Sequence, residues 1–180
     1  RVGETAPTFL LSTAEQDEQV SLADLTAEKP VCLIFGSYGC SIVQESAAQI
    51  KQLEEQFSDS INFTFIYTRE THSLDGWAAE FSKVEDPKTI EQRSTVAAQM
   101  KEELGFEMPV LIDTLNDSTA VRWGAMPVRL FVIDRETKVV YAGIQGPWGF
   151  MPTDEYKHEG ESADDWEKFI SSREGYSADC

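Results

Sequence analysis

The strongest constraint on the fold comes from residues 31–57, where a short apolar run leads through a glycine-bounded loop into a stretch of helical periodicity. The run V-C-L-I-F, closed by Gly36, is rich in β-branched and aromatic residues and is typical of a buried strand. From Val43 to Phe57 the apolar residues recur every three or four positions, which predicts a helix. The stretch therefore predicts a strand, a tight loop at residues 36–39 and a helix in direct succession.

Cys40 stands where this helix is expected to begin. The unpaired backbone N–H groups and the dipole of a helix favour an anion at that end. We therefore expect the pKa of the Cys40 thiol to be lower than that of a free thiol. Because the thiolate is the nucleophilic form, Cys40 is predicted to be a reactive nucleophile; the alternative is a small cysteine that only packs.

The chain has three cysteines and no Cys-x-x-Cys pair, since Ser37 and Val43 occupy the positions three residues from Cys40. This excludes a disulfide framework and the usual local dithiol oxidoreductase. Cys32 lies within the predicted strand and is expected to be inert. Cys180 is the last residue and could serve as a resolving thiol, within the chain or between the subunits of a homodimer.

Length and charge exclude several classes of function. A chain of 180 residues suits one domain with a sizeable core. The net charge of −17 repels nucleic acid and anionic membrane surfaces, so no nucleic-acid partner is expected. No apolar run approaches the ~18 residues of a membrane span, so we expect a soluble protein, with the cytoplasm favoured. The chain opens at Arg1 without a signal-peptide pattern, and a trimmed catalytic domain is one interpretation.

Neither a metal site nor a bound cofactor is predicted. The two histidines, His72 and His158, are far apart, and no cluster of His and Cys has the spacing of metal ligands. The sequence also has no glycine-rich phosphate loop.

The remaining sequence divides into short strands and helices. Residues 1–30 form an N-terminal extension that is expected to contain a β-hairpin. The elements predicted after the first helix are a strand at 61–67, a helix at 89–104, a strand at 109–112, a short helix at 116–123 and a hairpin of strands at 129–133 and 138–142. Residues 152–180 form an acidic tail with one helix expected at 163–171.

This order predicts a single α/β domain over residues 1–180 with a thioredoxin-like fold, in which a central mixed sheet is flanked by helices. The strand–helix–strand unit implies a parallel pair with a right-handed crossover. Pro127 precedes a core strand and fits the cis-proline that faces the nucleophile in that fold. Arg129 opens the same strand, so it reaches the edge that carries Cys40 only if this strand runs antiparallel to the first two.

Further candidate residues follow the second core strand, because ligands of open α/β sheets bind at the carboxyl ends of the strands. His72 suits proton transfer near neutral pH, and Glu70 is a candidate to orient it. Tyr67 and Trp77 are candidates to line an aromatic pocket, with core packing as the alternative for Tyr67. Ser37 is expected either to hydrogen-bond the thiolate or to cap the turn.

An ordered set of motifs across residues 30–152 resembles the iodothyronine deiodinases. F-G-S-Y-G-C, ending at Cys40, is similar to the active-site loop of that family, in which selenocysteine, or cysteine in some members, stands at this position. The other matching segments are Y-T-R-E-T-H and D-G-W within 67–77, T-I-E-Q-R at 89–93, D-T at 113–114, G-A-M-P-V-R-L at 124–130, V-V-Y at 139–141 and G-P-W-G at 146–149. The opening G-x-x-A-P-x-F resembles redoxins and peroxiredoxins.

The resemblance implies a reductive deiodinase with cysteine in place of selenocysteine. Cys40 would attack iodine on an aromatic ring of the iodothyronine type, and His72 with Glu70 would supply the proton. Arg129, beside Pro127, would hold the polar end of the substrate. The partners implied are a small iodinated aromatic substrate and an external thiol reductant, which clears the sulfur.

Two other functions stay open at this point. A peroxiredoxin-like thiol peroxidase needs a Pro-x-x-x-Thr-x-x-Cys loop, and here Leu33 replaces the proline while Ser37 replaces the threonine. A non-catalytic thioredoxin-fold module that binds a partner would leave Cys40, His72 and Arg129 without a role.

Overall fold

The computed structural model describes residues 1–150 and Pro152. The helix expected at 163–171, most of the acidic tail and Cys180 lie outside these described residues.

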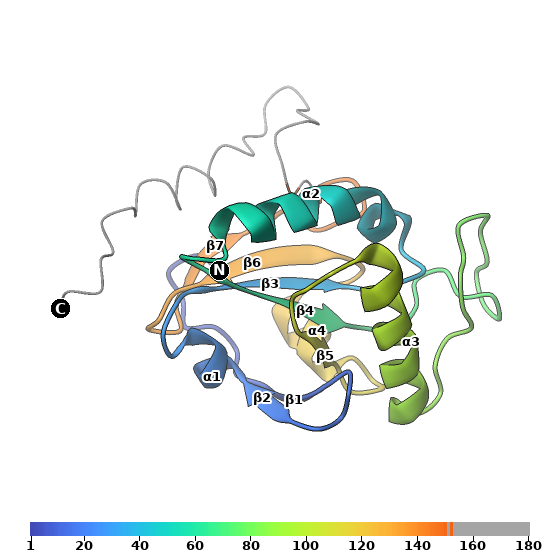
Figure 1. Cartoon of the computed structure of the whole chain (residues 1–180), viewed down its shortest axis with the longest axis horizontal. Helices are drawn as coiled ribbons and strands as arrows, with labels where there is room; N and C mark the ends of the chain where they lie inside the picture. Colours follow the sequence, from blue (N-terminus) through green and yellow to red (C-terminus); the bar gives the residue numbers. More distant parts are fainter. Residues whose placement is uncertain (151, 153–180) are drawn as a thin grey trace.

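A seven-stranded mixed sheet forms the centre of the molecule, with strand order β2-β1-β5-β4-β3-β6-β7 (Figure 1). Strands β3, β4 and β5 are parallel, and all other neighbours are antiparallel. The bounds are β1 Leu10–Thr13, β2 Gln19–Ser21, β3 Val31–Gly36, β4 Asn62–Tyr67, β5 Val110–Ile112, β6 Arg129–Ile133 and β7 Val139–Ala142. The expected N-terminal hairpin is therefore confirmed as β1 and β2.

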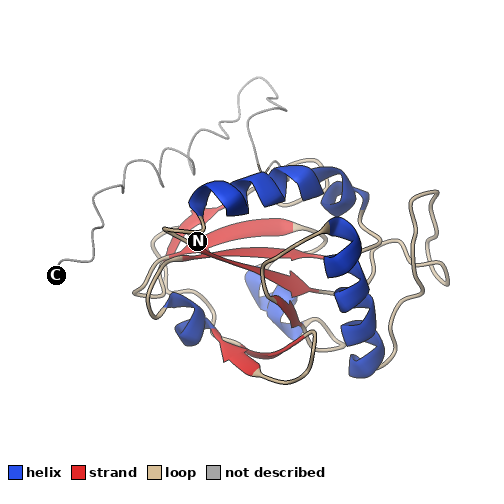
Figure 2. Ribbon diagram, viewed as in Figure 1, coloured by secondary structure: helices blue, strands red, loops and turns tan. Residues whose placement is uncertain are grey.

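Helices cover both faces of the sheet (Figure 2). They are α1 Leu22–Thr26, α2 Ser41–Phe57, α3 Ile90–Leu104 and α4 Ser118–Trp123. Side chains of α2 and α3 belong to one buried cluster, and side chains of α1 and α4 belong to the other. None of the helices in residues 1–150 has the length and apolar content needed to cross a bilayer.

Strand β3 lies at the middle of both clusters, and every residue in it is buried. Its side chains alternate between the two faces, as the two-residue period of a strand requires. Cys32 and Ile34 face the α2 side, whereas Leu33 and Phe35 face the α4 side. This explains why the strand reads as a continuous apolar run in the sequence.

Strand β6 is antiparallel to β3, with Arg129 opposite Phe35. The start of β6 therefore lies at the edge of the sheet where β3 ends and Cys40 follows. The Met126–Pro127 peptide bond that precedes β6 is cis. Both features match the arrangement expected from the sequence.

Helix α3 begins and ends at the residues that its sequence indicates. The side chain of Thr89 caps the helix by accepting a hydrogen bond from the backbone N–H of Gln92. Gly105 ends it with a φ of +68°, the left-handed conformation that glycine adopts readily. Between β4 and α3, residues 68–89 contain neither helix nor strand, and this segment runs past the end of the sheet next to the loop of Cys40.

Candidate functional site

Cys40 is the N-cap residue of α2, as predicted. Its backbone N–H donates to the carbonyl of Ser37 at 3.3 Å, which closes the loop that begins at Gly36. The backbone N–H groups of Ile42 and Val43 face the sulfur and lower the pKa of the thiol. Cys40 is only 3% exposed, so the nucleophile lies beneath the surface.

The prediction of a lowered pKa for Cys40 is wrong for this structure. Burial raises the pKa of the thiol and outweighs the two backbone N–H groups. The negative charges of Glu70 and Glu45 raise the pKa further. The helix terminus acts on the sulfur as expected, but the desolvation that the fold imposes is stronger.

Glu70 lies 5% exposed beside the loop of Cys40. Its carboxylate accepts hydrogen bonds from the backbone N–H of Tyr38 at 3.3 Å, from the backbone N–H of Gly39 and from the hydroxyl of Tyr67. Burial raises the pKa of this carboxyl, although the three hydrogen bonds oppose the shift. Glu70 thus fixes the loop, and these contacts lend no support to the hypothesis that it orients the imidazole of His72.

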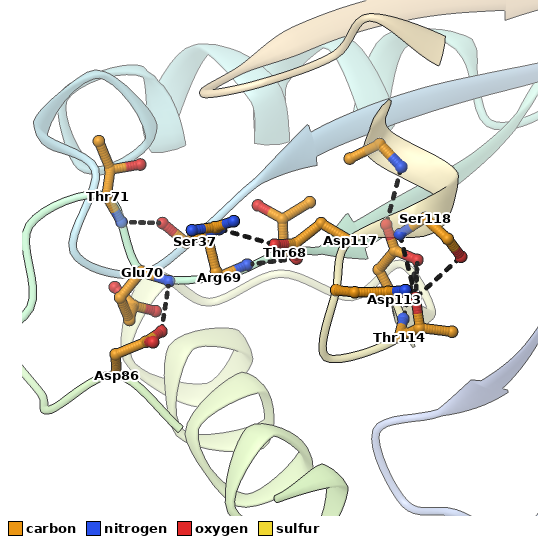
Figure 3. A network of polar contacts seen from close by, with 12 residues as sticks. Ser37, Thr68, Arg69, Glu70, Thr71, Asp86, Asp113, Thr114, Asp117 and Ser118 are labelled. Atoms are coloured by element: carbon orange, nitrogen blue, oxygen red, sulfur yellow. Dashed lines mark hydrogen bonds and ion pairs between the residues drawn. The ribbon is translucent and has the colours of Figure 1, made fainter. Parts of the chain in front are cut away.

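Tyr67 and Ser37 also hold the loop in place. Tyr67 is completely buried in the cluster on the α2 side, and its hydroxyl lies 3.4 Å from the backbone nitrogen of Tyr38. Burial raises its pKa well above the ordinary value. The hydroxyl of Ser37 accepts from the backbone N–H of Thr71 at 3.4 Å (Figure 3). A hydrogen bond from Ser37 to the sulfur stays a prediction.

Gly39, the residue before Cys40, lies against the backbone of His72. A β-carbon placed on Gly39 would clash with the Glu70 carboxylate and would lie 2.8 Å from the carbonyl oxygen of His72. The backbone of the segment after β4 is therefore pressed against the loop, and only glycine leaves room for this approach.

The imidazole of His72 lies in a small aromatic group. Its ring centre is 4.8 Å from that of Trp77 and 4.9 Å from that of Phe81. Nδ1 lies 3.2 Å from the carbonyl oxygen of Trp77. Because a carbonyl only accepts, Nδ1 carries the proton, and Nε2 is the nitrogen left to exchange one. Trp77 itself is 76% exposed and offers an aromatic surface to solvent next to His72.

Arg129 lies at the predicted edge, but its side chain turns to the other face of the sheet. Nε donates to the carbonyl of Gly143 at 2.7 Å, and Nη1 donates to the carbonyl of Gly124 at 3.0 Å. The guanidinium also stacks 4.9 Å from the ring centre of Phe131, which belongs to the cluster on the α4 side. In this conformation Arg129 ties together the segments around the half-buried Pro127, and its predicted contact with a substrate is untested.

The structure contains a buried ion pair that was not predicted from the sequence. Arg93 on α3 and Asp117 before α4 are each 1% exposed, and Nη1 of Arg93 donates to Oδ1 of Asp117 at 2.9 Å. Arg69, next to Glu70, donates from Nε to Oδ2 of Asp117 at 2.8 Å (Figure 3). Arg93 belongs to the segment T-I-E-Q-R, and its spacing places it on the same face of α3 as Ile90 and Ala97. Its charge nevertheless favours an exposed position, since an arginine is almost never fully buried without a partner.

Tyr38 joins the loop to two other elements. Its hydroxyl donates to Glu103 on α3, and its carbonyl accepts from the side-chain amide of Gln44 at 2.7 Å. The same amide donates to the carbonyl of Phe81 at 3.2 Å, in the segment that carries His72. Within the described residues, no group of three or more His, Cys, Asp or Glu side chains is placed to hold a metal ion.

Comparisons with known proteins agree with the motifs. A family model described as iodothyronine deiodinase matches residues 1–163. The type I iodothyronine deiodinase of Xenopus laevis is 29% identical over 71% of this chain and 50% of its own length. The thyroxine 5-deiodinase of Sparus aurata is 29% identical over 83% of this chain and 56% of its own length. The chain thus spans about half the length of these relatives.

Solved structures confirm the fold. The thioredoxin domain of a thiol-disulfide oxidoreductase from Bacteroides vulgatus superposes with a TM-score of 0.59 at 17% identity, covering 81% of this chain and 90% of that domain. The expected thioredoxin-like architecture is therefore confirmed. Since the family model covers most of the sequence, the chain belongs to the iodothyronine deiodinase family.

Proposed function

We propose that this chain catalyses the thiol-dependent, reductive removal of iodine from iodinated aromatic substrates of the iodothyronine type, with Cys40 as the nucleophile. The observation that carries the proposal is the position of Cys40 at the N-cap of α2, with the carboxylate of Glu70 and the backbone of His72 packed against the preceding residue. Membership of the deiodinase family supports the same reaction class.

The reaction needs a soft nucleophile and a proton. The Cys40 thiolate attacks iodine, the carbon–iodine bond breaks, and the ring carbon takes a proton while a sulfur–iodine bond forms. An external thiol then displaces iodide to give a mixed disulfide, and a second thiol releases Cys40 and leaves as a disulfide. Two thiols are oxidised to a disulfide for each carbon–iodine bond that is reduced. They supply both electrons, so the reaction needs no bound redox cofactor.

The described residues suit these steps in different ways. The N–H groups of Ile42 and Val43 stabilise the sulfur anion when it forms. In the imidazolium form, Nε2 of His72 can deliver a proton while Nδ1 keeps its hydrogen bond to the carbonyl of Trp77. The exposed ring of Trp77 offers a face on which an iodinated ring can stack.

The test is iodide release from an iodothyronine in the presence of dithiothreitol, with hydrogen peroxide offered in a parallel reaction. We expect iodide release from the parent protein and from Cys32→Ser, and none from Cys40→Ser. Cys32 is the matched control because it is a buried cysteine on the same face of the sheet, and burial raises its pKa far above the ordinary range. Peroxide consumption without iodide release from any iodothyronine would favour the thiol peroxidase instead.

A second variant examines the proton donor. His72→Ala is expected to lower the rate of iodide release by ~10²-fold if the imidazole acts as a general acid. The loss should appear in kcat, because the proton is transferred in the chemical step. An unchanged kcat would remove His72 from the mechanism and leave the role of Cys40 intact.

A further inference from the structure

Two arginines from separate segments, the partly exposed Arg69 and the buried Arg93, contact the buried carboxylate of Asp117. Oδ1 of Asp117 accepts from the backbone N–H of Arg69 at 2.9 Å and from Nη1 of Arg93 at 2.9 Å. Oδ2 accepts from Nε of Arg69 at 2.8 Å. Asp117 itself is in the left-handed region with a φ of +53°, an uncommon conformation for a residue other than glycine. The carboxylate is thus held in one place by the elements on either side of it.

Burying the ion pair of Arg93 and Asp117 costs free energy, so its presence needs an explanation other than stability. Arg93 is completely enclosed, and its Nη1 also donates to the carbonyls of Asp113 at 3.2 Å and Thr114 at 2.8 Å. Removing such a charge pair from water costs several kcal/mol, and apolar residues of the same size often stabilise a core as well or better. A buried pair is therefore better explained by the position that it imposes on its neighbours.

A short path leads from Asp117 to the nucleophile. Asp117 fixes both the backbone and the side chain of Arg69, and Arg69 is covalently joined to Glu70. The carboxylate of Glu70 in turn accepts hydrogen bonds from the backbone N–H groups of Tyr38 and Gly39, the two residues before Cys40. Every step of the path is either a covalent bond or a hydrogen bond (Figure 3 shows the part around Asp117, Arg69 and Glu70).

We propose that Asp117 is a positioning residue for Cys40: by fixing Arg69 it places the carboxylate of Glu70, which holds the loop that keeps the nucleophile closed at the start of α2. This inference rests on the proposed role of Cys40 as the nucleophile. Asp117 does not touch the sulfur and acts through Arg69 and Glu70.

The consequence concerns the reactivity of the thiol. Without the Asp117 contacts, the segment after β4 relaxes and the Glu70 carboxylate leaves the loop. Cys40 then becomes more accessible, and its pKa falls because the charge of Glu70 is one of the causes that raise it. Loss of Asp117 should therefore make Cys40 more reactive and at the same time less well placed for turnover.

The experiment is alkylation by iodoacetamide, followed for each cysteine by peptide mass spectrometry across a pH series. Asp117→Asn keeps the size of the side chain but turns an amide N–H toward Nε of Arg69. We expect Cys40 to react on the order of tenfold faster at neutral pH, which corresponds to a fall of about one unit in its pKa. Cys32 is fully buried on the same face, so its rate reports global unfolding and should not change.

Two controls separate positioning from general destabilisation. Arg122→Ala removes an exposed arginine of α4 itself, whose Nε donates to the carbonyl of Ser118 in the same helix, and should leave the rate of Cys40 unchanged. Glu70→Gln should also accelerate Cys40, and adding Asp117→Asn to it should bring little more, because both changes act on the same path.

Several results would overturn the inference. These are an unchanged or slower reaction of Cys40 in Asp117→Asn, equal acceleration of Cys40 and Cys32, or fully additive effects with Glu70→Gln. If Asp117→Asn fails to fold, Arg69→Ala replaces it, since the side chain of Arg69 is 59% exposed and only its Nε contact is lost. That variant should accelerate Cys40 a fewfold, and no acceleration would equally refute the inference. Alkylation needs no iodinated substrate, so its outcome is independent of whether the protein releases iodide.

Discussion

Gly39→Ala is the most direct test of how closely the loop of Cys40 meets the segment after β4. The added β-carbon would overlap the Glu70 carboxylate and would lie 2.8 Å from the carbonyl oxygen of His72, about 0.6 Å short of ordinary contact at 3.4 Å. Glu70 cannot simply swing away, because the N–H groups of Tyr38 and Gly39 and the hydroxyl of Tyr67 hold its carboxylate. The loop must therefore move as a whole.

The cost follows from two contributions. Forcing extra volume into a packed site costs about 1–3 kcal/mol. Losing the hydrogen bond from Gly39 to a charged carboxylate costs about 1.5–3 kcal/mol, and the stiffer unfolded chain returns about 0.4–1 kcal/mol. We expect a net loss of about 3 kcal/mol, which lowers Tm by about 6–12 °C for a chain of this size.

Thermal unfolding followed by circular dichroism measures this shift. Gly3→Ala is the matched control, because its β-carbon meets nothing within 4 Å and only its φ of +87° is strained. We expect this control to cost roughly 1 kcal/mol, or about 2–4 °C. If Gly39→Ala melted within about 2 °C of Gly3→Ala, the argument that the loop and the His72 backbone are in enforced contact would be refuted.

Three further outcomes follow from the same geometry. Since burial raises the pKa of Cys40, both its alkylation and iodide release should increase with pH beyond the ~8.5 of a free thiol, and a plateau below that value would show that the site opens in solution. Burial also raises the pKa of Glu70, so the protonated carboxyl stabilises the fold below the ordinary carboxyl pKa of ~4.3, and this stabilisation is lost as the pH rises through the pKa of the folded state. In urea unfolding, the parent protein should therefore lose stability relative to Glu70→Gln over that pH range, and a constant difference between the two proteins would contradict the argument. Arg129→Ala should lower the free energy of unfolding by about 1–3 kcal/mol, because it removes two hydrogen bonds to backbone carbonyls, and this loss is separate from any rise in KM. A variant as stable as the parent in urea would show that these contacts are dispensable.

The linear sequence determined most of the architecture. Apolar periodicity located β3, α2, β4 and α3, and α3 ends at Gly105, directly after the helix predicted at 89–104. These features are local, because a strand or a helix of this kind is encoded by residues within one or two turns of each other. The placement of Cys40 at a helix terminus and of His72 and Glu70 at the same sheet edge followed from the order of the elements.

Only the tertiary structure decided the chemical state and the contacts of these residues. The pKa of Cys40 rises because the fold buries the sulfur and brings the charge of Glu70 from the segment after β4, and neither effect is visible along the chain. Arg129 turns to the α4 side because β6 alternates its side chains, and the register with β3 fixes which face each one takes. The pairing of Arg93 with Asp117 joins positions 24 residues apart, so it depends on how α3 and α4 pack against the sheet and not on any local pattern.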